Sequence, residues 1–118
     1  MKRTILFSLA ILSAVLLNAA VGISNGNTTL YYELNNTEKI ATLVPSEGEP
    51  YAGVVNIPEN IQHDGVSYDV ATIAKEAFKG CKELTEISIP RTITKIGGHA
   101  FKGCENLRTV NYNATNCV

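Results

Sequence analysis

Apolar residues in the second half of the chain recur at one fixed spacing, which is the spacing from Ala77 to Ala100. The segment Ala77-Phe78-Lys79-Gly80-Cys81 returns unchanged as Ala100-Phe101-Lys102-Gly103-Cys104. The same spacing links further apolar pairs: Val70 and Ile93, Ile73 and Ile96, Leu84 and Leu107, Ile87 and Val110, and Ile89 and Tyr112. A fixed period of this length is typical of stacked repeats, in which each unit buries its apolar side against the next. The pattern therefore predicts a solenoid.

Each repeat is expected to begin with a strand. In Leu84-x-x-Ile87-x-Ile89 the last two apolar residues alternate with polar ones, as the two faces of a strand require, and Pro90 then ends the strand. Phe101 is expected to fill a corner of the core from a short helical turn. The inward-facing repeat positions are Phe78, Cys81, Leu84, Ile87, Ile89, Ile93, Ile96, Phe101, Cys104 and Leu107.

Both the period, about 23 residues, and the strand spacing fit a leucine-rich repeat, whose units have roughly 20–29 residues. We therefore expect a mainly β fold with short helical turns, arranged as a leucine-rich-repeat solenoid of about two coils. A looser copy, Val55-Asn56-Ile57-Pro58, precedes Ile87-Ser88-Ile89-Pro90 by more than one period. The extra residues fall between Gln62 and Tyr68, where His63-Asp64-Gly65 predicts a turn.

A different pattern precedes the repeats. Leu30 to Leu34 and Lys39 to Val44 each have the composition of a strand, and Asn35 to Glu38 between them predicts a hairpin loop. Pro45 to Gly53 contains turn-forming Gly and Pro and predicts an irregular surface loop. Because a solenoid exposes its first coil unless something covers it, we expect residues 23–53 to cap the N-terminal end of repeats that occupy residues 54–118.

The repeats are expected to be incomplete at the C-terminal end. Asn116 has the same phase as the core residue Ile93, so a polar side chain stands where the pattern calls for an apolar one. This favours either a chain truncated from a longer array or an open end that associates with a second molecule.

The N-terminus has the order of a secretory signal peptide. Lys2 and Arg3 precede an uncharged apolar run, Ile5 to Leu17, and small residues follow it. We expect cleavage after Gly22, which gives a signal of residues 1–22, with cleavage after Ala20 as the alternative. An uncleaved membrane anchor is less favoured because a spanning helix needs about 20 apolar residues. The sequence therefore predicts a secreted or cell-surface protein, without a membrane span once the signal is removed.

The repeat also resembles a known family. Ile89-Pro90, Ile96-Gly97 and Ala100-Phe101, followed by Cys104, are similar to the BspA-like leucine-rich repeat of bacterial surface and secreted proteins. The resemblance implies a Bacteroides-type bacterial protein with a non-catalytic role in adhesion or scaffolding. It implies no catalytic residue, cofactor or metal ligand. A purely structural fragment of a longer surface repeat protein is the alternative. With 10 basic and 11 acidic residues, the chain also has no basic excess that would favour nucleic acid.

The cysteines share the phase of the repeat. Cys81 and Cys104 are expected to stack on neighbouring coils, at a spacing that a disulfide can span, although buried free thiols are favoured. Cys117 is out of phase with both, and could pair with another molecule. A Cys/His hydrolase, with His63 or His99 as the base, is a distant alternative, since a periodic residue points to packing and catalysis needs one site.

The residues between the inward positions predict an interaction face. On the three expected strands they form two rows, one of Val54, Glu86 and Thr109 and one of Asn56, Ser88 and Asn111. Alternation places both rows on one sheet face. The resemblance implies a protein or surface-glycan partner on such a face, and end-to-end self-association is a further expectation. A merely solvated surface is the alternative, because the rows lack the Trp, Tyr or Arg that dominate tight interfaces.

Overall fold

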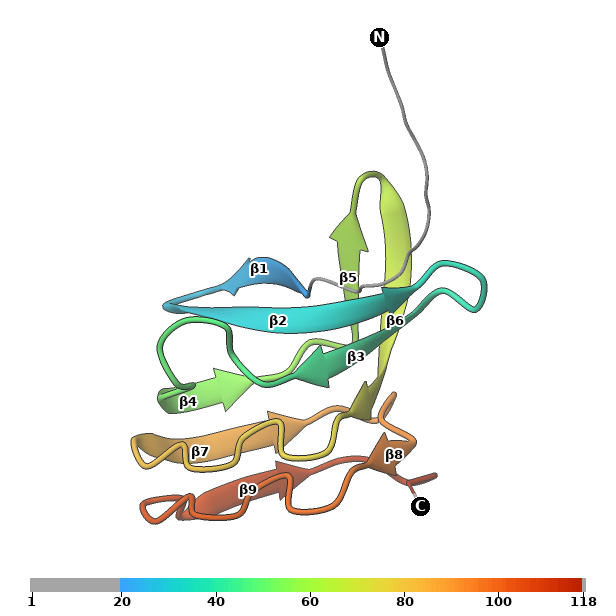
Figure 1. The fold of residues 1–118 in the computed structure, drawn as a ribbon. Coiled ribbons are helices and arrows are strands. Elements are labelled where there is room, and N and C mark those ends of the chain that lie inside the picture. Colours follow the sequence, from blue (N-terminus) through green and yellow to red (C-terminus); the bar gives the residue numbers. More distant parts are fainter. Residues whose placement is uncertain (1–19, 118) are drawn as a thin grey trace, which may run out of the picture.

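The computed structural model describes residues 20–117, and within them the fold is built from strands and turns without a helix. Two sheets are present (Figure 1), one in the order β1-β2-β3-β6-β5 with β8 paired to β6, the other in the order β4-β7-β9. The strands are β1 (Val21–Asn25), β2 (Thr28–Asn35), β3 (Ile40–Val44), β4 (Gly53–Asn56), β5 (Asn60–His63), β6 (Val66–Ile73), β7 (Leu84–Ile89), β8 (Lys95–Ile96) and β9 (Thr109–Tyr112).

The sheet β4-β7-β9 confirms both repeat offsets. Its strands are parallel, with Val55 opposite Ile87 across the longer offset and Ile87 opposite Val110 across the regular one. Figure 1 shows the three strands stacked at successive levels. Parallel strands need a long connection between them, and here each connection is one turn of the solenoid. The mainly β leucine-rich-repeat architecture predicted from the period is therefore present.

The second strand of each coil, β6 in one and β8 in the next, keeps the same repeat register. β8 lies parallel to β6, with Ile96 opposite Ile73, and the Gly97 amide donates to the Ile73 carbonyl at 2.8 Å. Gly97 is required at this point because a Cβ there would lie 2.3 Å from the backbone nitrogen of Lys75. The close approach of two backbones therefore explains one glycine of the repeat.

The corners of the coils are hydrogen-bonded turns and not the short helical turns expected. The Cys104 amide donates to the Phe101 carbonyl three residues earlier, and the Phe78 amide crosses to the Ala100 carbonyl of the next coil at 2.8 Å. A helix cannot propagate here because His99 and Gly103, on either side of the corner, have φ values of +58° and +80°. Each corner therefore stops after a single turn.

The predicted N-terminal hairpin is present as β2 and β3, which meet at the pair Asn35 and Ile40. The Asn35 side-chain oxygen accepts hydrogen bonds from the amides of Thr37 and Glu38 and fixes the loop. β3 then runs parallel to β6, so the hairpin is continuous with the sheet of the repeats. Strand β1, which pairs with β2, was not predicted. The expected signal lies outside the described residues except for its last three, and Val21 and Gly22 belong to β1.

The insertion predicted between Gln62 and Tyr68 is a β-hairpin. The expected turn at Asp64-Gly65 is confirmed, with φ values of +52° and +79°, and it joins β5 to β6. Positive φ at both central residues is the geometry that favours Asp-Gly in two-residue hairpins. The flanking strands were not predicted, because only the turn residues carry a strong local signal.

The core is completely covered in the middle coil and open at the last one. Ile87 and Ile89 are 0% and 2% exposed, whereas their repeat equivalents Val110 and Tyr112 are 50% and 52% exposed. Val110 and Tyr112 therefore take the repeat positions of Ile87 and Ile89 but are not covered there. Four further positions expected to face inward are only half-buried: Ile96, Phe101, Cys104 and Leu107. The physical reason is that no described segment packs over the far side of β9.

Candidate interaction surface

The outward-facing residues of β4, β7 and β9 lie in two rows, as the sequence predicts. Val54 stands opposite Glu86, which stands opposite Thr109. In the second row, Asn56 pairs with Ser88, and Ser88 with Asn111. We call these six residues the row face. Its edge members are exposed, and Glu86 and Ser88 on the central strand are half-buried.

Side-chain hydrogen bonds connect the two rows. The Asn111 Nδ2 donates to Glu86 Oε2 and to Ser88 Oγ, both at 3.1 Å. These bonds hold the amide and the carboxylate in place across β7 and β9. Glu86 is the single ionisable residue among the six, so the row face is polar and weakly acidic. Such a surface can accept and donate hydrogen bonds to a neutral polar partner.

A polar groove adjoins the row face at β4. It has a volume of about 840 Å³ and is bounded by the β1–β2 turn, the loop between β3 and β4, and β4 itself. Its lining includes Val54 and Asn56 of the row face. Asn25 Nδ2 donates to the Asn56 backbone carbonyl at 2.9 Å and joins the β1–β2 turn to β4. This groove was not predicted from the sequence, because its walls come from segments with no shared pattern.

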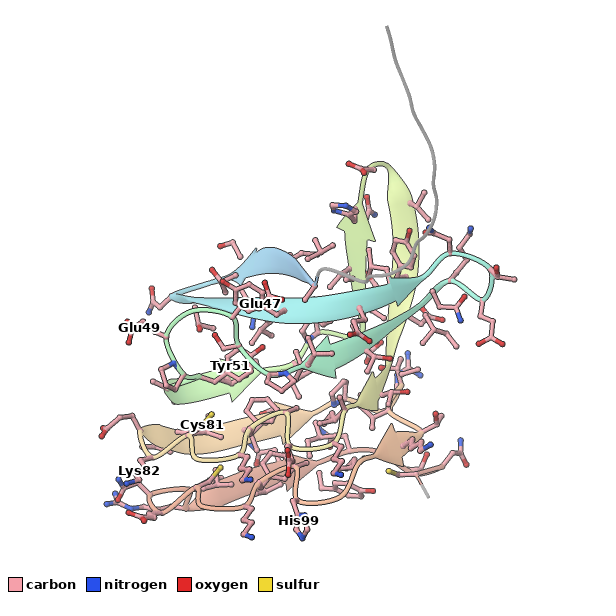
Figure 2. All side chains as sticks on the ribbon, in the orientation of Figure 1. Glu47, Glu49, Tyr51, Cys81, Lys82 and His99 are labelled. Carbon is pink, nitrogen blue, oxygen red and sulfur yellow. The ribbon has the colours of Figure 1, made fainter. Side chains whose placement is uncertain are left out.

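The loop Pro45 to Gly53, expected as an irregular surface segment, is anchored by one buried residue. Tyr51 is buried, and its ring centroid lies 5.0 Å from that of Phe78. Its hydroxyl donates to the Val44 carbonyl at 2.7 Å and accepts from the Tyr31 amide at 3.1 Å. Burial disfavours the phenolate and raises the pKa of Tyr51 to about 12. The Tyr51 side chain therefore fixes the wall of the groove to the core (Figure 2).

The cysteines on the repeat are placed for packing. Cys81 and Cys104 are free thiols, Cys81 is buried, and the Cys104 thiol donates to the Phe78 carbonyl at 3.0 Å. Burial raises the pKa of both thiols. A protonated thiol is a poor nucleophile near neutral pH. Cys117 is half-buried, and its pairing with another molecule stays a prediction.

The two histidines occupy different parts of the molecule. His63 lies in the β5–β6 hairpin with its Nε2 3.3 Å from Asp64, and His99 is exposed at a coil corner. Figure 2 shows His99 and Cys81 apart from each other. Among residues 20–117, no three His, Cys, Asp or Glu side chains gather in a group that could hold a metal ion.

The chain belongs to the BspA-type leucine-rich repeat family. The family model for the BspA type leucine-rich repeat region matches residues 55–117, which is more than half of the chain and contains the whole repeated segment. No curated protein matches the chain.

Solved structures of bacterial leucine-rich repeat proteins are similar to the chain. One from Bacteroides ovatus has 32% identity and a TM-score of 0.63 over 69% of this chain and 21% of its own. A leucine-rich cell surface protein from Faecalibacterium prausnitzii has 30% identity and a TM-score of 0.63 over 86% of this chain and 26% of its own. One from Bacteroides capillosus shares the fold at 24% identity, with a TM-score of 0.65 over 82% of this chain and 68% of its own. The chain thus spans about a quarter of the length of the first two.

Proposed function

We propose that the chain is a non-catalytic, secreted or cell-surface leucine-rich-repeat protein whose row face contacts a protein or a surface glycan in adhesion or scaffolding. The observation that carries the proposal is the in-register placement of six outward, mostly polar side chains across three strands. The printed description of the Faecalibacterium relative as a cell surface protein supports the location. Within residues 20–117, no helix is long and apolar enough to cross a membrane.

The row face fits a weak and repeated contact. It contains no Trp, Tyr or Arg, the side chains that contribute most to tight protein interfaces. Many copies on one surface compensate for weak single contacts, because linked binding events occur at a high effective concentration. We therefore expect adhesion by many copies to be measurable where binding by a single copy in solution is weak.

A second candidate role is structural and is favoured by the exposed end of the repeats. Val110 and Tyr112 are about half exposed at positions that are buried one coil earlier. This apolar end fits either a further coil of a longer surface protein or a second copy associated end to end. In that role the chain would extend an array and bind no separate ligand.

The test replaces together the three row-face residues that are hydrogen-bonded to one another. We expect the variant Glu86→Arg, Ser88→Arg, Asn111→Arg to reduce the adhesion of beads that carry many copies to protein-coated or glycan-coated surfaces. The matched control is Glu33→Arg, Ser67→Arg, Gln62→Arg, which makes equivalent changes at exposed positions of the other sheet. Unchanged adhesion of a folded row-face variant would remove this face as the site and favour the structural role.

A further inference from the structure

The groove beside β4 has the size of a small-ligand site and a lining rich in polar side chains. Its volume of about 840 Å³ lies within the roughly 300–1,000 Å³ typical of ligand pockets. Amides and hydroxyls from three separate segments line it: Asn25, Asn27, Thr28, Thr29, Ser46 and Asn56. Each amide offers both donors and acceptors, and each hydroxyl offers one donor and two acceptors. This set of donors and acceptors matches a ligand that is itself rich in hydroxyl groups.

The charges of the groove select against an anion. Glu49 is the single carboxylate in the lining, and no Lys, Arg or His is among the lining residues. A phosphate, a sulfate or an acidic sugar would therefore meet one like charge and no compensating cation. The remaining polar groups are neutral, so the groove fits a neutral ligand.

Tyr31 supplies a fixed aromatic surface on one wall. Its ring lies close to Gly22 on the neighbouring strand β1, where an added Cβ would come within 3.0 Å of the ring carbon Cε2. Its hydroxyl is 3.5 Å from the corresponding position at Gly48. The backbone amide of Tyr31 is held by the buried hydroxyl of Tyr51. Because aromatic faces carry a partial negative charge, the C–H groups of a sugar ring can pack on such a surface.

An extended peptide fits the groove less well. A peptide could add only along the free edge of β4, which has four residues, Gly53–Asn56. The carbonyl of Asn56 already accepts the hydrogen bond from Asn25. Strand addition draws its affinity from a row of main-chain hydrogen bonds, and this edge is short and partly occupied.

We propose that the groove binds a neutral saccharide, with Tyr31 packed against the sugar ring and the surrounding amides and hydroxyls bonded to its hydroxyl groups. The site is distinct from the central and outer strands of the row face, and it shares only Val54 and Asn56 with that face. It gives the chain a saccharide site whose lining lies mostly outside the row face, so that it can be tested separately from the row face.

The experiment titrates the full chain with glucose, galactose, mannose, N-acetylglucosamine, lactose and cellobiose while amide chemical shifts are recorded. We expect saturable shifts in the groove for at least one sugar, and weaker shifts with galacturonic acid and glucose 6-phosphate. Tyr31→Ala should lower the affinity about tenfold, and Tyr31→Phe should retain it, since the ring remains; tenfold corresponds to about 1.4 kcal/mol. Tyr112→Ala removes an exposed tyrosine outside the groove and should leave the sugar affinity unchanged.

Thr29→Arg keeps the test valid if Tyr31→Ala fails to fold, because Thr29 is exposed and a long side chain there would fill the groove. The row-face variant with Glu86, Ser88 and Asn111 replaced should keep sugar binding, so the two proposals can fail separately. Absence of saturable shifts with every neutral sugar would overturn the inference. Tighter binding of an acidic sugar or of an extended peptide would also overturn it. Equal losses of sugar affinity in Tyr31→Ala and Tyr112→Ala would do the same.

Discussion

Phe78 and Phe101 stack with their ring centroids 5.2 Å apart and their planes 9° from parallel, yet only Phe78 is fully buried. They occupy the same position in successive coils, one repeat period apart. The Tyr51 ring also contacts Phe78, with ring centroids 5.0 Å apart, and we call these three rings the aromatic column. The difference in burial within this column leads to the first prediction.

Phe78→Ala should destabilise the protein more than Phe101→Ala. Removing a fully buried Phe costs about 3–5 kcal/mol, because contacts are lost on every side and a cavity remains. Phe101 is half-buried, so its replacement should cost roughly 1–3 kcal/mol. Urea unfolding of both variants measures the difference. Equal losses would mean that Phe101 is covered in solution, as it would be in an end-to-end dimer or a longer array.

The adjacent glycines Gly97 and Gly98 should respond differently to alanine. A Cβ at Gly97 would lie 2.3 Å from the Lys75 nitrogen, so the two coils must move apart, whereas a Cβ at Gly98 meets nothing within 4 Å. We expect Gly97→Ala to cost about 1–3 kcal/mol or more and Gly98→Ala to be within about 1 kcal/mol of the parent chain. Thermal unfolding of the pair tests the close approach. Similar melting temperatures would contradict it.

Tyr51→Phe should lower stability although the ring is kept. The change removes a hydroxyl that donates to Val44 and accepts from Tyr31, and it leaves a buried carbonyl and a partly buried amide without that partner. A buried group left without a partner costs about 1–3 kcal/mol. The free energy of unfolding, compared with that of Tyr112→Phe at an exposed site, measures the effect. No loss relative to that control would show that the loop is anchored by the ring alone.

The same tyrosine predicts a loss of stability at high pH. Its pKa is raised from near 10 to about 12 by burial, so the folded state keeps the proton that the unfolded state releases. Stability from this group is fully present below pH 10 and falls as the pH rises from 10 to 12. Burial also raises the pKa of Tyr32, so Tyr51→Phe should remove only part of the decline. Unfolding curves between pH 8 and 11.5 test this, and a flat profile would contradict it.

We predict that the expected signal peptide is cleaved after Ala20 and not after Gly22. Val21 and Gly22 pair with Tyr32 and Tyr31, so cleavage after Gly22 would remove the first two residues of β1. Cleavage after Ala20 would leave the strand whole. We therefore expect the processed chain to begin at Val21, which mass spectrometry of secreted material can show. A chain that begins at Ile23 would contradict this choice, and one that retains Met1 in a membrane fraction would favour an anchor.

The register of the coils could be predicted from the residues alone. A solenoid places equivalent positions side by side, so the spacing between Ile87 and Val110 in the sequence is also their pairing in space. The same reasoning correctly placed Phe78 beside Phe101 and Glu86 between Val54 and Thr109. The turn between β5 and β6 could also be predicted from its own residues, because Asp64 and Gly65 favour the positive φ that a tight hairpin needs.

Only the tertiary structure decided which of these positions are covered. Periodicity assigns Ile87 and Val110 the same side of a strand, but burial depends on what packs beyond that strand, and only Ile87 has a coil on both sides. Tyr51 lies in a segment without a period, so nothing in its neighbours indicates that it completes the aromatic column. The polar groove depends in the same way on contacts between segments distant in the chain, such as Asn25 with Asn56. A repeat encodes contacts between equivalent residues, whereas contacts at its ends and insertions are set by the folded chain as a whole.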